Sequence, residues 1–69
     1  MSDSVYKVIE IVGVSDDSWE DAARNAIATA SKSLRDLRVA EVMKLDVTID
    51  GEGASRFRTR LSVSFKYED

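Results

Sequence analysis

A stretch of alternating residues, VAEVMKLDVTIDGEGASRFRTRLSVSF at positions 39–65, decides the fold of this chain. Apolar side chains occupy every second position on both sides of Gly51 and Gly53, a pattern typical of two β-strands joined by a tight turn. We therefore predict a long hairpin whose strands start at Val39 and end near Phe65. We expect residues 51–53 to form a three-residue loop with a glycine in the left-handed conformation.

The length of this loop fixes which side chains face each other across the hairpin. A two-residue loop would place apolar residues opposite charged ones, whereas a three-residue loop matches like with like. Asp46 and Arg58 then lie directly opposite each other, where opposite charges can pair. The expected apolar pairs are Val47 with Phe57, Leu45 with Thr59, and Met43 with Leu61.

Upstream of the hairpin, the sequence predicts one strand and one helix. Val5–Val12 is rich in β-branched and aromatic residues and reads as a strand ended by Gly13. We expect Ser15 to cap the helix that follows, with Ser18 as the alternative. Apolar residues then recur at the helical spacing of three and four: Trp19, Ala22, Ala23, Ala26, Ile27, Ala30, Leu34 and Leu37.

This helical face consists mostly of alanine, so we expect the helix to lie close against a sheet. Lys32, Arg35 and Arg38 are expected near its C-terminal end, where the helix dipole favours positive charge. The element order is β-α-β-β, which predicts an α+β fold in a single domain of residues 1–69. The expected sheet is three-stranded and antiparallel, with the third strand in the middle and the helix covering one face.

The other face of this sheet is predicted to mix apolar with charged residues, which suits a subunit contact better than bare solvent. The side chains expected on it are Tyr6, Val8, Val12, Ala40 and Val42 beside Lys44, Asp46, Arg56, Arg58 and Arg60.

Composition narrows the class of protein. The chain has 69 residues and neither Cys nor His, so disulfides, thiolate metal sites and the commonest general base are excluded. A domain this small buries only about 60% of its unfolded surface, so assembly is the expected source of additional stability.

The net charge of −3 argues against binding to nucleic acid. No signal peptide or membrane-length apolar run is visible, so we expect a cytoplasmic protein with no membrane partner. The chain has no combination of acid–base or nucleophilic residues that would indicate an enzyme, so we do not expect catalysis.

The ordered set of segments resembles the dodecin family across nearly the whole chain. The resemblance rests on VYKVIEIVG at 5–13, the helix SDDSWEDAARNAIATASKSLRDL at 15–37, RVAEV at 38–42 and LSVSFKYED at 61–69. This resemblance implies a hollow homo-dodecamer that is built from trimers. It also implies that the protein stores a small ligand, which is riboflavin or FMN in the flavin-binding members, and that it is not an enzyme.

At the positions that match the family's flavin-binding residues, this chain departs from the pattern. Val39 stands where the family has a Trp that stacks on flavin, Arg58 replaces a Gln, Asp46 replaces an Arg, and Lys66 keeps a basic residue. Flavin binding is therefore expected to be weak or lost. The chain is similar to a Trp-lacking branch for which calcium has been proposed as the ligand. Retention of riboflavin or FMN in a modified site and a shell without a small ligand remain alternatives.

Calcium would need several oxygen ligands that converge on one point. The acidic candidates follow no EF-hand spacing, although symmetry in an oligomer could repeat one carboxylate around an axis. The metal-ligand candidates are Glu10, Asp16, Asp17, Glu41 and Asp46.

Two further features have a functional and a structural interpretation. Arg56, Arg58 and Arg60 with Lys66 form a basic stripe that could hold a phosphate, for example of FMN or coenzyme A, but we favour ion pairing with acidic neighbours. Trp19 is the only Trp, and we interpret it as a packing residue near the helix start and not as a substitute flavin partner.

Overall fold

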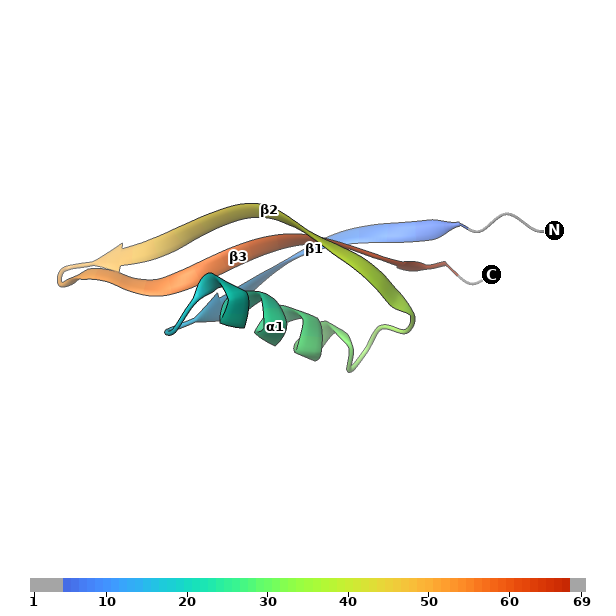
Figure 1. Cartoon of the computed structure of the whole chain (residues 1–69), viewed down its shortest axis with the longest axis horizontal. Helices are drawn as coiled ribbons and strands as arrows, with labels where there is room; N and C mark the ends of the chain where they lie inside the picture. The colour runs from blue at the N-terminus through green and yellow to red at the C-terminus, as the bar shows by residue number, and fades with distance from the viewer. Residues whose placement is uncertain (1–4, 68–69) are drawn as a thin grey trace.

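The structure, a computed structural model, describes residues 5–67. Four elements follow in order: β1 (Tyr6–Ser15), α1 (Trp19–Ala30), β2 (Leu37–Asp50) and β3 (Gly53–Lys66). The strand order is β1-β3-β2, with β3 antiparallel to both neighbours, and α1 lies on one face of the sheet (Figure 1). The predicted β-α-β-β order, the central third strand and the single helical layer are all confirmed.

The side of the sheet that packs on α1 is called the helix face below, and the opposite side the open face. Leu61 and Val63 of β3 are each 1% exposed on the helix face, where they pack with Ala26 of α1. By alternation, Arg58, Arg60, Ser62, Ser64 and Lys66 of β3 belong to the open face.

The helix and the sheet approach each other closely at Gly13. A Cβ added there would lie 1.9 Å from the backbone oxygen of Ala22 and 2.9 Å from the Cβ of Ala26. The expectation that an alanine-rich helix lies close against the sheet is therefore confirmed. The prediction that Gly13 ends the first strand is wrong, because β1 continues to Ser15 and the glycine serves this contact instead.

The N-terminal cap of α1 is Ser18, the alternative, and the preference for Ser15 is wrong. The Ser18 hydroxyl accepts a hydrogen bond from the Asp21 backbone N–H at 3.0 Å, as an N-cap does. Ser15 is instead the buried last residue of β1, and its hydroxyl donates to Asp21 Oδ2 at 2.8 Å.

The helix is shorter than its apolar spacing predicted. It ends at Ala30, where Ser31 bonds through both its backbone N–H and its hydroxyl to the carbonyl of Ile27. Leu34 follows the helix, and Leu37 already belongs to β2 after a left-handed Asp36 with φ of 57°. The last helical turn contains no basic residue, so the predicted dipole contacts of Lys32, Arg35 and Arg38 are wrong.

Three irregularities in the β2–β3 pairing set the faces of β2. Near Met43, Val42 pairs with Leu61 while Lys44 pairs with Arg60, so Met43 is an extra residue and does not face Leu61 as predicted. One extra residue shifts every side chain beyond it to the other face. Ala40 and Val42, predicted on the open face, therefore lie on the helix face.

The hairpin turn is one residue shorter than predicted. Asp50 pairs with Gly53, which leaves only Gly51 and Glu52 outside the ladder, and Gly53 has the expected positive φ, at 113°. Ser55 is an extra residue in β3 that restores the parity a longer loop would have given. For this reason the predicted partners of three β2 residues are confirmed: Val47 with Phe57, Leu45 with Thr59, and Asp46 with Arg58.

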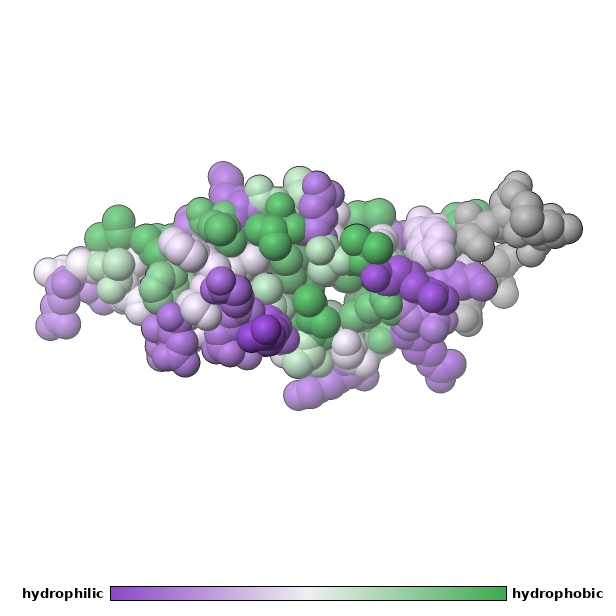
Figure 2. Space-filling view, viewed as in Figure 1, coloured by the Kyte–Doolittle hydropathy of each residue, from purple (hydrophilic) through white to green (hydrophobic). Residues whose placement is uncertain are grey.

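The subunit is elongated, measuring 56 × 20 × 15 Å. Its radius of gyration is 14.4 Å, whereas a compact domain of this length has about 11 Å. The β2–β3 hairpin extends past the start of α1 (Figure 1), and Figure 2 shows apolar side chains at the surface along this arm. Among residues 5–67, no helix is both long and apolar enough to cross a membrane.

Candidate ligand site on the open face

The four residues at flavin-site positions lie on one face of the sheet. Val39 pairs with Ser64 and Asp46 pairs with Arg58, so all of these side chains belong to the open face, as does Lys66 at the end of β3. Simple alternation from Leu45 predicted Val39 on the helix face, which is wrong. The extra residue Met43 moves Val39 to the open face and brings it onto the same surface as Asp46.

At one end of this row of residues, Asp46 and Arg58 form an ion pair. Arg58 Nε donates to Asp46 Oδ1 at 2.9 Å, and the side chains of Arg58 and Asp46 are 38% and 43% exposed respectively. A charge-assisted bond of this length occupies one oxygen of the carboxylate and one N–H of the guanidinium. Val39 is 62% exposed and provides a branched aliphatic surface without an aromatic ring.

The other two arginines of β3 also have acidic partners. Arg56 Nε donates to Asp16 Oδ1 at 3.1 Å, and Arg60 Nη1 donates to Glu10 Oε1 at 3.3 Å. The three partners come from the β1–α1 loop, from β2 and from β1, so the pairs connect β3 to three other segments. The ion-pairing interpretation of these three arginines is therefore confirmed.

The metal-ligand candidates do not converge within one subunit. Glu10, Asp16 and Asp46 each bind an arginine, and the Asp17 backbone N–H donates to Ser15 Oγ at 2.9 Å in the loop before α1. Glu41 lies on the open face opposite Ser62, whose other partner is Glu10. Over residues 5–67, no group of three acidic side chains is arranged to hold a metal ion.

Trp19 lies on the other side of the sheet, at the start of α1. Its ring meets Phe57 edge to face, with centroids 5.1 Å apart and an interplanar angle of 77°, which agrees with the predicted packing role. Its indole N–H also donates to the backbone oxygen of Asp46 at 3.0 Å. No sequence pattern indicates this bond, because the two residues are 27 positions apart and their contact depends on how the helix docks on the sheet.

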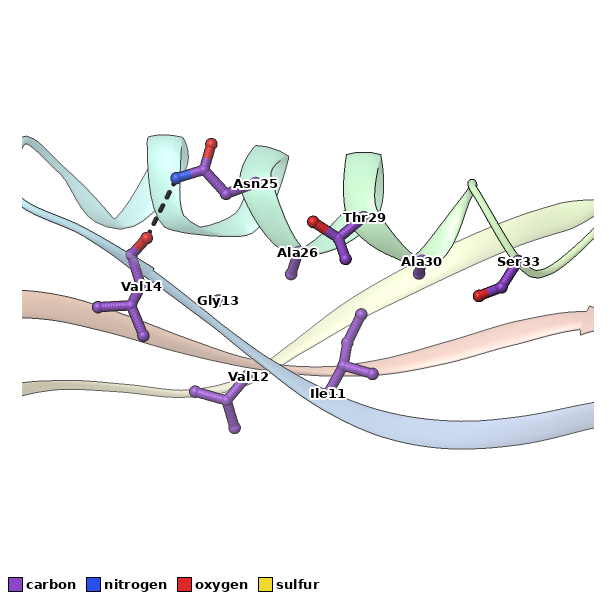
Figure 3. A pocket seen from close by; sticks show the side chains of 9 residues that line it. All are labelled: Ile11, Val12, Gly13, Val14, Asn25, Ala26, Thr29, Ala30 and Ser33. Carbon is purple, nitrogen blue, oxygen red and sulfur yellow. Dashed lines mark hydrogen bonds between the residues drawn. The ribbon is translucent and has the colours of Figure 1, made fainter.

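Sequence reasoning also missed two grooves on the helix side. The larger, about 480 Å³, lies along the edge of β1, where Asn25 Nδ2 donates to the Val14 backbone oxygen at 3.1 Å (Figure 3). Small residues at 13, 26 and 30 leave the space between strand and helix. The smaller groove, about 230 Å³, lies toward β2 and is lined by Trp19, Glu20, Ala23, Val42, Leu45 and Thr59.

Comparison with known proteins identifies relatives along almost the entire chain. A model of the dodecin family matches residues 5–68. The chain is 49% identical to calcium dodecin of Mycobacterium tuberculosis over 91% of its own length and 89% of the relative's. It is 38% identical to a dodecin of Thermus thermophilus over 94% of each chain.

Solved structures agree with this assignment. The dodecin of Streptomyces coelicolor superimposes with a TM-score of 0.92 at 35% identity, covering 100% of this chain and 99% of that one. The M. tuberculosis calcium dodecin, described as calcium-chelating with a novel calcium-binding site, gives a TM-score of 0.86 at 48% identity, with 94% and 93% covered. Dodecins are homo-dodecamers that bind or store small ligands. This chain belongs to the dodecin family.

Proposed function

We propose that this dodecin forms a hollow homo-dodecamer, built from trimers, that binds a small ligand other than a tightly stacked flavin. The observation that carries the proposal is the Asp46–Arg58 ion pair of 2.9 Å on the same face as Val39. The proposed protein is a single domain of residues 1–69 that works in the cytoplasm in storage or buffering and not as an enzyme.

The residues present do not fit a flavin ring. Stacking needs an extended π-face, and base-on-aromatic stacking contributes roughly 1–3 kcal/mol per ring as a scale. Val39 offers no such face, and Asp46 and Arg58 satisfy each other's charge. Inserting a flavin would break this pair and leave both charged groups to be solvated or paired again.

Two properties of the subunit support the assembly. Its elongated shape leaves little surface buried within one chain, and large apolar side chains are exposed on both faces of the sheet, including Val8, Val39, Leu45 and Ile49. Apolar surface of this extent on a monomer is typical of a subunit contact. In a dodecamer, neighbouring subunits would cover these side chains.

Native mass spectrometry of the protein purified from its own host tests the proposal. We expect a mass of twelve subunits that releases no flavin on gentle denaturation. Tight riboflavin or FMN binding with strong quenching of flavin fluorescence would contradict it. The complementary gain-of-function variant combines Val39→Trp, Asp46→Arg and Arg58→Gln, and we expect it to acquire flavin binding.

A second candidate ligand is a calcium ion, favoured by the 49% identity to calcium dodecin. The carboxylates of one subunit do not fit the ion, because three of the five candidates bind arginines and no group of three converges among the described residues. A calcium site would therefore take carboxylates from neighbouring subunits, with Glu41 on the open face as the first residue to test.

A chelator experiment decides between the two candidates. If calcium is bound between subunits, EGTA lowers the melting temperature of the wild-type oligomer, added Ca²⁺ restores it, and Glu41→Gln reduces the response. A melting temperature that is the same in EGTA and in Ca²⁺ would count against the cation and leave the first proposal in place.

A further inference from the structure

The only tryptophan of the chain contacts three residues at the Asp46–Arg58 pair, Asp46, Phe57 and Thr59, from the helix side of the sheet. Its indole N–H donates to the Asp46 backbone oxygen at 3.0 Å. Its backbone oxygen accepts a hydrogen bond of 2.9 Å from the Thr59 hydroxyl. Its ring packs edge to face on Phe57, so the residues on both sides of Arg58 touch Trp19.

These contacts join α1 to β2, two elements that otherwise have few contacts with each other. The helix packs on β1 and β3, and Trp19 at its first position reaches across to β2. Thr59 is 1% exposed, so its hydroxyl has no water to replace this partner. Losing a hydrogen bond to a buried group costs more free energy than losing an exposed one. We call the contacts of Trp19 with Asp46, Phe57 and Thr59 the clamp, and we expect it to hold β2 and β3 firmly where they carry Asp46 and Arg58.

We infer that Trp19 is a positioning residue for the open-face site, holding the Asp46–Arg58 pair through the backbone of β2 and β3. This inference rests on the proposed function only in naming the open face as the ligand face. The pair itself is half-exposed, and two long polar side chains at a surface are held together weakly unless the backbone fixes their separation. The β2–β3 ladder sets this separation by placing Asp46 opposite Arg58, and the Trp19 contacts support this part of the ladder from the side that a ligand does not occupy.

The first experiment measures the fluorescence of Trp19, which needs no ligand. Asp46→Asn weakens the pair without changing side-chain size, and we expect an emission shift of several nanometres and a clear change in iodide quenching. Glu10→Gln is the matched control, since it weakens another ion pair of the same face, whose acidic residue is not the hydrogen-bond partner of the Trp19 indole. Unchanged emission in Asp46→Asn, or an equal change in both variants, would overturn the inference.

The second experiment works in the opposite direction. Trp19→Phe keeps an aromatic ring for Phe57 but removes the N–H donor to Asp46. By NMR we expect solvent exchange of Arg58 Nε–H to become at least about threefold faster, because the pair opens more often. Arg56 Nε–H, which bonds to Asp16 at 3.1 Å, is the internal reference.

The readings of this second experiment separate positioning from general packing. Faster exchange at Arg58 alone supports the clamp, whereas equal acceleration at Arg56, or none at either arginine, refutes it. If Trp19→Phe does not fold, the fluorescence comparison of Asp46→Asn with Glu10→Gln still decides. Flavin or calcium binding enters neither readout, so the proposed function can fail while this inference holds.

Discussion

The β1 side and the β2 side of the helix face differ in how they are covered. Where α1 lies over β1 and β3, Ala22 is fully buried and Leu61 is 1% exposed. On β2, the same face of the same sheet leaves Leu45 49% and Val42 53% exposed. One short helix can cover only part of the sheet, so the chain buries the β1 side of this face by itself and leaves the β2 side exposed, where we expect a neighbouring subunit to cover it.

The largest effect is expected where the covered side is tightest. Gly13→Ala places a Cβ 1.9 Å from the Ala22 backbone oxygen, so helix and strand must separate, at a cost of at least about 3 kcal/mol. Thermal unfolding followed by circular dichroism measures the loss. The control is Gly51→Ala in the hairpin turn, where a Cβ meets nothing within 4 Å and we expect a change within about 0.5 kcal/mol. Similar melting temperatures for both variants would show that the contact between α1 and Gly13 is looser than in this structure.

The next effect compares the two sides directly with one substitution type. Leu61→Ala removes a buried side chain and should cost about 2–5 kcal/mol. Leu45→Ala would cost far less in an isolated subunit, but we expect a loss above about 1 kcal/mol because a neighbour covers the side chain. Melting at two protein concentrations and native mass spectrometry test this. A Leu45→Ala protein with wild-type stability and assembly would mean that β2 stays exposed.

The smallest effect concerns the ion pairs of the two sides. Asp46→Asn on the β2 side and Glu10→Gln on the β1 side should each cost about 0–1 kcal/mol of stability, because all four side chains involved are more than a third exposed. Both losses should shrink in high salt, where exposed charges are screened. Denaturant titrations at low and high salt measure this. A salt-independent loss for Asp46→Asn alone would show that assembly buries that pair.

Local sequence patterns predicted the element types and much of the pairing. Alternation over residues 39–65 found both hairpin strands, and the match of Asp46 with Arg58 proved correct although the turn was one residue shorter than expected. Parity explains this success, because Ser55 restored the register that the shorter turn would have shifted. The helix was predicted too long because apolar spacing continued through Leu34 and Leu37 while the serines at 31 and 33 favoured a turn.

The candidate site was predicted less well, for a related reason. The sequence placed Val39 on the wrong face, because the extra residue at Met43 cannot be recognised from the alternation of apolar and polar residues. It also could not connect Trp19 with Asp46, whose contact depends on where the helix crosses the sheet. Which three of the five acidic candidates meet an arginine was equally hidden, because the arginine partners lie up to 50 positions away along the chain.

The sequence by itself determined the β-α-β-β order, the tight turn with a positive-φ glycine and the resemblance to dodecins, because these depend on neighbouring residues and their periodicity. Only the tertiary structure decided that Gly13 serves the helix contact, that Val39 shares a face with the Asp46–Arg58 pair, and that Trp19 supports this pair from behind. Bulges and helix docking are settled by the packing of distant segments, and no local pattern records which arrangement packs best.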